Sequence, residues 1–94
     1  MFKWLNKQGV ESSDGFAVQF TGRFTAEYRE GHKIISLSVE DGFSNFQPCI
    51  ILRSNAFNKW DSNEGKLSEN EKLRIVKNFK DACSFQGLEV VIED

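Results

Sequence analysis

Only three side chains of this 94-residue chain belong to histidine or cysteine, which often serve as metal ligands or nucleophiles. A metal site or a catalytic triad needs several converging side chains, and nothing in the sequence pairs with the single histidine, His32. We therefore expect His32 to be solvated in a turn. Cys49 and Cys83 lie in apolar patterns, and we expect both to be buried, reduced thiols.

Carboxylates are more numerous, and pairs such as Glu40 with Asp41 or Glu69 with Glu71 have the residue types of a general acid and base. The first pair starts a polar loop pattern. The second falls in the first turn of a predicted helix, where acidic side chains suit the helix dipole. The glycines lack the spacing of a phosphate-binding loop. The sequence therefore predicts no enzyme, no cofactor and no metal site.

Composition limits the class of protein. A chain of 94 residues is the size of one domain, and its hydrophobic content of 39% is sufficient for a core. The 12 basic and 14 acidic residues give a net charge of -2, unlike a strongly basic nucleic-acid binder. No apolar run has the length of a membrane span or a signal peptide. We expect a single cytoplasmic domain, 1–94, without direct nucleic-acid or membrane contacts.

The alternation of apolar and polar residues predicts the strands that would position the side chains of any functional site. Five segments have strand patterns: 16–21, 24–29, 35–40, 49–53 and 88–92. The turn Glu30-Gly31-His32, with a positive φ at Gly31, joins the second and third strands into a hairpin. Residues 40–47 are interpreted as a loop, and Pro48 is placed at the first position of the fourth strand.

One amphipathic helix is predicted after the fourth strand. Ser68 and Glu71 form a capping box at its start, and Gly87 ends it in a left-handed cap. Its apolar stripe is made of Leu73, Val76, Phe79 and Cys83, widened by Ile75 and Ala82. The predicted fold is α+β: a single antiparallel sheet of about five strands in the order ββββαβ, with the helix packed on one face. Residues 1–14 are expected to be an N-terminal arm or short helix against the sheet.

Part of this pattern, roughly residues 15 to 92, resembles a known family. The residues that carry the resemblance are Glu27 to Gly31, Trp60 before an acidic loop, Leu67-Ser68-x-x-Glu71, Ile75, Asn78, Ala82, Phe85-x-Gly87 and Leu88-Glu89-Val90. They look like small bacterial immunity proteins of polymorphic-toxin and contact-dependent growth inhibition systems, in particular the immunity protein 74 family. The resemblance implies a cytoplasmic α+β protein without enzymatic activity. It would bind and neutralise the toxin domain encoded next to it, often a nuclease.

A meander topology would bring five side chains to one end of the sheet: Tyr28, Glu30, Trp60, Asp61 and Glu64. The acids could face a basic cleft of the toxin, and Trp60 has the residue type that most often anchors an interface. Trp60 could equally fold back to cover the edge of the sheet. The other functions considered are a protein-binding adaptor or accessory subunit, and a small-ligand module that uses the sheet face opposite the helix. The oligomeric state stays open.

Overall fold

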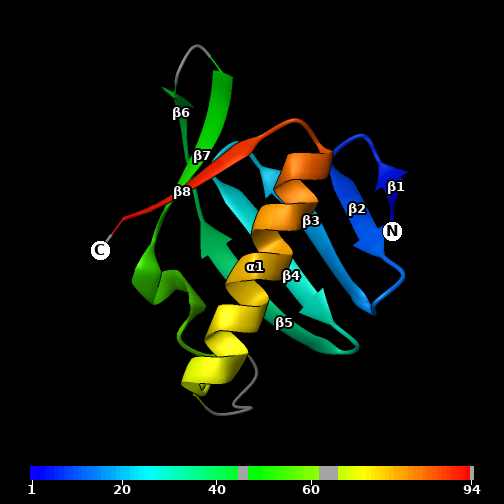
Figure 1. The fold of residues 1–94 in the computed structure, drawn as a ribbon, viewed down its shortest axis with the longest axis vertical. Coiled ribbons are helices and arrows are strands. Elements are labelled where there is room, and N and C mark those ends of the chain that lie inside the picture. Colours follow the sequence, from blue (N-terminus) through cyan, green and yellow to red (C-terminus); the bar gives the residue numbers. More distant parts are fainter. Residues whose placement is uncertain (45–46, 62–65, 94) are drawn as a thin grey trace.

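The computed structural model describes residues 1–44, 47–61 and 66–93. Its fold is α+β, as predicted, with one long helix and two sheets (Figure 1). The first sheet is antiparallel and contains β1 (Phe2–Asn6), β2 (Gly9–Ser12), β3 (Phe16–Gly22), β4 (Thr25–Glu30) and β5 (Lys33–Ser38), in that order. The second contains β6 (Glu40–Ser44), β7 (Gln47–Arg53) and β8 (Glu89–Glu93).

The prediction of a single sheet needs correction, because the strands at 49–53 and 88–92 are not part of the five-stranded sheet. They are β7 and β8, which pair in parallel from Cys49 opposite Glu89 to Arg53 opposite Glu93. A 3-10 helix, η1 (Ser54–Phe57), and the helix α1 (Glu69–Phe85) connect them. Parallel strands need such a long crossover, whereas the predicted meander assumed that the chain reverses at every turn.

Two segments expected to lack strand structure are strands. Residues 1–14 are neither an arm nor a short helix, because β1 and β2 form a hairpin that completes the five-stranded sheet. The predicted loop at 40–47 contains β6, which pairs with β7 so that Phe43 lies opposite Pro48. Pro48 is the second residue of β7, not the first.

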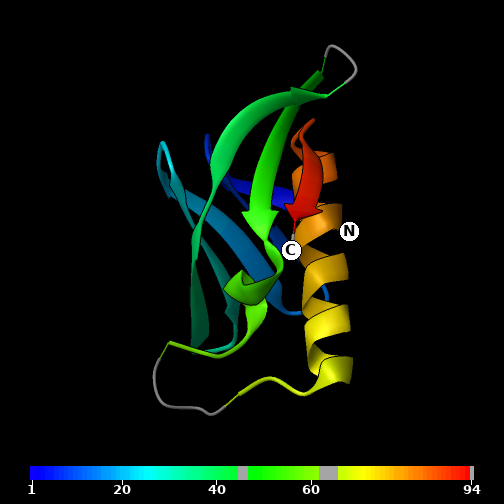
Figure 2. The same cartoon turned by 90° about the vertical axis from the view of Figure 1, so that its left-hand side faces the viewer.

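The hairpin of β4 and β5 is confirmed, and Gly31 in its turn has a φ of 61°. Helix α1 covers one face of the five-stranded sheet, and the opposite face is left uncovered (Figure 2). The strands β6 and β7 extend past the C-terminal end of α1 in both views. The fold is therefore two-layered, with its core between the helix and the first sheet.

The predicted apolar stripe of the helix is confirmed except at Leu73. Ile75, Phe79, Ala82 and Cys83 are buried, whereas Leu73 is 66% exposed. Their partners in the core include Val18, Leu37, Leu52 and Phe57. All four buried residues belong to the predicted stripe, and Val76 is partly buried against the core. Helix α1 packs against β8 and η1 as well as β2 and β3, and Leu73 lies outside these contacts at the exposed side of the helix.

Both predicted ends of α1 are confirmed. The Glu71 amide donates to the Ser68 hydroxyl at 3.1 Å, and the Ser68 amide donates to the Glu71 carboxylate at 3.1 Å. At the other end, Gly87 has a φ of 81°, and the Leu88 amide donates to the Cys83 carbonyl at 2.8 Å. The first bonds satisfy amides at the start of the helix, and the last belongs to a Schellman cap at its end.

Replacing Ser68 by alanine is expected to lower the free energy of unfolding by about 0.5–2 kcal/mol, because the Glu71 amide loses its acceptor. Chemical denaturation followed by circular dichroism measures the change. Ser84→Ala is the matched control, since Ser84 is exposed in the last turn of the same helix. Equal stability of the Ser68 variant and the wild type would contradict a stabilising role for the cap.

Candidate partner-binding groove

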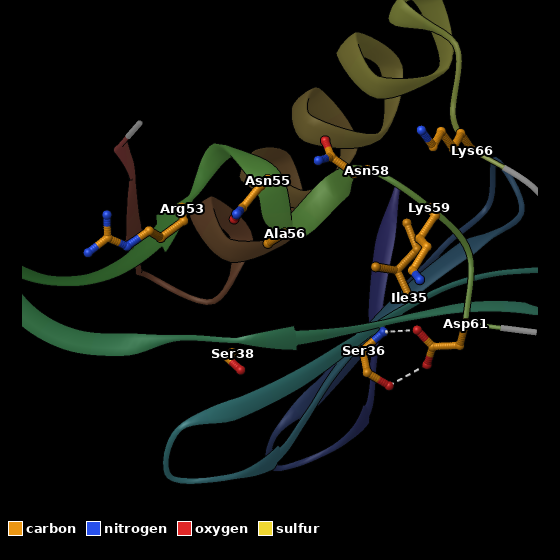
Figure 3. A pocket seen from close by; sticks show the side chains of 10 residues that line it. All are labelled: Ile35, Ser36, Ser38, Arg53, Asn55, Ala56, Asn58, Lys59, Asp61 and Lys66. Carbon is orange, nitrogen blue, oxygen red and sulfur yellow. Dashed lines mark hydrogen bonds between the residues drawn. The ribbon is translucent and has the colours of Figure 1, made fainter.

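A groove of about 530 Å³ runs between strand β5 and the segment that contains η1 and residues 58–61 (Figure 3). Strand β5 is an edge of the five-stranded sheet, so one side of its backbone faces this groove instead of another strand. Ser36 and Ser38 line the groove from β5, and Asn55 and Asn58 line it from the other side. The groove thus combines backbone groups of a sheet edge with polar side chains.

Asp61 fixes one end of this edge. Its amide donates to the Ile34 carbonyl at 2.8 Å, and its carboxylate accepts the Ser36 amide at 2.9 Å. The Ser36 hydroxyl donates to the second carboxylate oxygen, as Figure 3 shows. The residues of β5 that face away from β4 are therefore Ile34, Ser36 and, by alternation, Ser38. Beyond Asp61, the Ser36 carbonyl and the Ser38 amide are directed toward the groove.

Among the described residues, the charged side chains that line the groove are mostly basic: Arg53, Lys59 and Lys66, with Asp61 as the acidic one. Lys59 and Lys66 are held next to each other by an antiparallel bridge, which the Leu67 amide extends by donating to the Asn58 carbonyl at 2.9 Å. Like charges on paired backbones repel, and they raise the positive potential nearby. The two lysines therefore bring positive charge to the groove, while the Asp61 carboxylate is held by Ser36.

The predicted site residue Tyr28 is not on this surface, because it is fully buried under α1. Its hydroxyl donates to Glu30 at 2.6 Å and accepts from the Asn78 amide at 3.0 Å. Arg74 donates to both oxygens of Glu30, at 2.8 and 3.1 Å. Burial raises the pKa of Tyr28, and the bond to Glu30 raises it further. These four residues tie β4 to the helix, so Glu30 is already committed to an internal partner.

Trp60 is also not a surface residue, since only 3% of it is exposed and it belongs to the core. The Lys33 ammonium group lies 5.5 Å from the centroid of its ring. Of the two alternatives for Trp60, the structure has the one in which the ring folds back against the sheet. Glu64 lies outside the described residues. The expected surface of five residues therefore reduces, among the described residues, to Asp61 at the groove and Glu30 in the Tyr28 network.

Sequence reasoning missed two features of the surface. The sequence pattern gave no signal for the antiparallel bridge between Lys59 and Lys66. Sequence reasoning also missed an exposed aromatic pair, Trp4 and Phe85, whose ring centroids lie 5.7 Å apart. The alternation of Phe2 and Trp4 with Lys3 between them is typical of a strand, and it could have placed Trp4 in β1.

Both cysteines are free and buried, as predicted. Burial raises the pKa of the Cys83 thiol to about 12, so this side chain stays protonated at neutral pH. Within the described ranges, no cluster of three or more histidine, cysteine or acidic side chains could hold a metal ion. On the face of the first sheet that α1 leaves uncovered, charged side chains form ion pairs, such as Lys3 with Glu11 and Arg29 with Glu27.

Comparisons with protein-family models, with curated proteins and with solved structures found no match to this chain. Among the described residues, no helix is long and apolar enough to span a membrane.

Proposed function

We propose that this chain is an immunity protein that acts in the cytoplasm, where it binds a cognate bacterial toxin domain and neutralises it. The family resemblance makes a nuclease the expected class of toxin. The observation that carries the proposal is the groove at β5, which presents backbone groups of a sheet edge beside the lysine pair Lys59 and Lys66. An edge strand next to a groove can accept an extended segment of a partner, which gains main-chain hydrogen bonds.

The charge of the groove changes the expected mode of binding. Sequence reasoning placed acidic residues against a basic cleft of the toxin, but Glu30 is bonded to Arg74, and Asp61 is bonded to Ser36. The groove carries the lysine pair Lys59 and Lys66. Complementary potentials steer association and suppress wrong partners. The toxin segment that enters the groove is therefore expected to bear carboxylates.

The first experiment tests neutralisation itself. The toxin domain encoded next to the gene for this chain is expressed in a bacterium, with and without this chain, and growth is measured. We expect the chain to restore growth and to copurify with the toxin domain. Growth arrest that persists when both proteins are present would contradict the proposal. Copurification without restored growth would favour an adaptor instead.

The second experiment tests the groove. Replacing Lys59 and Lys66 together by glutamate reverses two charges at the groove, and we expect the Kd for the toxin domain to rise about 10–100-fold. Isothermal titration calorimetry measures the change. The double variant Lys3→Glu with Lys77→Glu is the control, because it alters the net charge equally at two lysines away from the groove. Equal affinity of the groove variant and this control would exclude the groove as the binding site.

A further inference from the structure

The second exposed edge of the five-stranded sheet is β1, at the opposite end from the groove. The Ser13 amide donates to the Met1 carbonyl at 2.9 Å, so Met1 faces β2. Residues of an antiparallel strand alternate between facing a neighbour and facing away from it. Lys3, which lies opposite Glu11, therefore faces β2, and the backbone groups of Phe2 and Trp4 are directed outward.

Apolar side chains gather beside this edge. Trp4 is 51% exposed and Phe85, at the end of α1, is 44% exposed. The rings of Trp4 and Phe85 are 5.7 Å apart, and Phe2 lies 5.5 Å from Phe85. Met1 adds a further exposed apolar side chain. Aromatic side chains in such a cluster are the type that anchors protein interfaces.

The usual protection of an edge strand is weak at β1. Natural sheets block their edges with lysine, proline or bulges. The lysine of β1, Lys3, forms an ion pair with Glu11 at 3.0 Å on the sheet face opposite the aromatic cluster. The register shift of β1 lies beyond Trp4, between Trp4 and Asn6, so it leaves Phe2 to Trp4 regular. The edge is thus a short regular strand with an apolar border.

We propose that two copies of this chain associate through β1. The two strands would pair in antiparallel fashion about a twofold axis, joining the two five-stranded sheets into one of ten strands and covering Trp4 and Phe85. An axis through Lys3 places Phe2 of each copy opposite Trp4 of the other, within the regular part of β1, and each Lys3 keeps Glu11 as its ion-pair partner. The proposal does not depend on the proposed function, because β1 and the groove are on different edges of the sheet.

Two observations favour a second copy over another kind of partner. An antiparallel pair of identical strands is self-complementary, because a twofold axis matches each outward amide with an outward carbonyl of the other copy. The net charge of -2 also gives little repulsion between copies, and a patch dominated by aromatic rings offers few charges for selecting a different partner. Each chain has one β1 edge, so the association closes at a dimer.

Sedimentation equilibrium of the full chain, from about 10 µM to about 1 mM, tests the proposal. We expect a monomer–dimer equilibrium between the chain mass of 10.8 kDa and twice that value. Trp4→Glu is expected to stay monomeric. Phe24→Glu is the matched control that keeps the dimer, because Phe24 is 53% exposed but lies at the turn between β3 and β4.

Hydrogen exchange of the wild-type chain provides a readout that needs no variant. The outward amides of Phe2 and Trp4 should exchange slowly at high concentration and fast at low concentration, because they are paired only in the dimer. A wild-type chain that remains monomeric at about 1 mM would overturn the proposal. The proposal would also be overturned by assemblies larger than a dimer or by a Trp4→Glu variant that still dimerises. A dimer in which the Phe2 and Trp4 amides exchange fast would overturn it as well.

Discussion

Replacing Phe79 by alanine is expected to lower the free energy of unfolding by about 3–5 kcal/mol, the largest effect of any single substitution in α1. Phe79 is fully buried, and its ring packs edge-on against Phe57 with the centroids 5.6 Å apart. It joins the helix to η1, so truncation removes apolar contacts and leaves a cavity between them. The helix covers one face of the first sheet, and a cavity beneath it weakens the core between them.

Urea denaturation followed by circular dichroism measures this loss. Leu73→Ala is the control, because Leu73 is on the same helix but 66% exposed, and it should cost less than about 1 kcal/mol. If Phe79→Ala also costs less than about 1 kcal/mol, the packing of α1 against η1 described above is wrong.

Replacing Trp60 by alanine is also expected to cost about 3–5 kcal/mol of stability. Its ring is 3% exposed and contacts the Lys33 ammonium group, so alanine removes both the buried area and this cation–π contact. The loss extends to the next residue. Asp61 bonds to Ile34 and Ser36 from a backbone position that the Trp60 ring anchors, and these bonds should weaken in the variant.

Trp4→Ala provides a matched control, since it removes the same side chain from a site that is 51% exposed. Measured at low micromolar concentration, it should cost less than about 1 kcal/mol. A similar loss for both tryptophans would contradict the assignment of Trp60 to the core. Trp60→Phe should recover part of the stability, because phenylalanine restores most of the apolar area but not the full ring.

The parts of the fold that were predictable from the sequence are those set by local signals. The hairpin of β4 and β5 follows from alternation on both sides of Gly31, and α1 follows from the box at Ser68 and the cap at Gly87. Each signal lies within a few residues of the element that it specifies. Such signals are independent of how the rest of the chain is arranged.

The incorrect predictions involve partners far away in the sequence. The Asp41-Gly42 pair has the composition of a turn, yet both residues lie in β6 because β7 supplies their hydrogen-bond partners. The parallel pairing of β7 with β8 depends on the path of the intervening helix, which periodicity does not contain.

The candidate site was less predictable than the fold for the same reason. Glu30 and Arg74 are 44 positions apart, and Asp61 and Ser36 are 25 apart. The sequence showed that two acids were present near a predicted turn and loop. It did not show that Glu30 is bonded to Arg74 away from the groove, or that Lys59 and Lys66 are paired beside it.

The parallel pair of β7 and β8 has a consequence for the order in which the chain folds. Neighbouring strands from β1 to β5 are joined by short turns, so they can zip together with little loss of chain entropy. Cys49 instead meets Glu89, 40 residues later, after the long helix has formed and docked. Closing that loop is the slowest kind of contact to form, so β8 should join last. During synthesis, the first sheet can assemble on the ribosome well before β8 emerges to close the second.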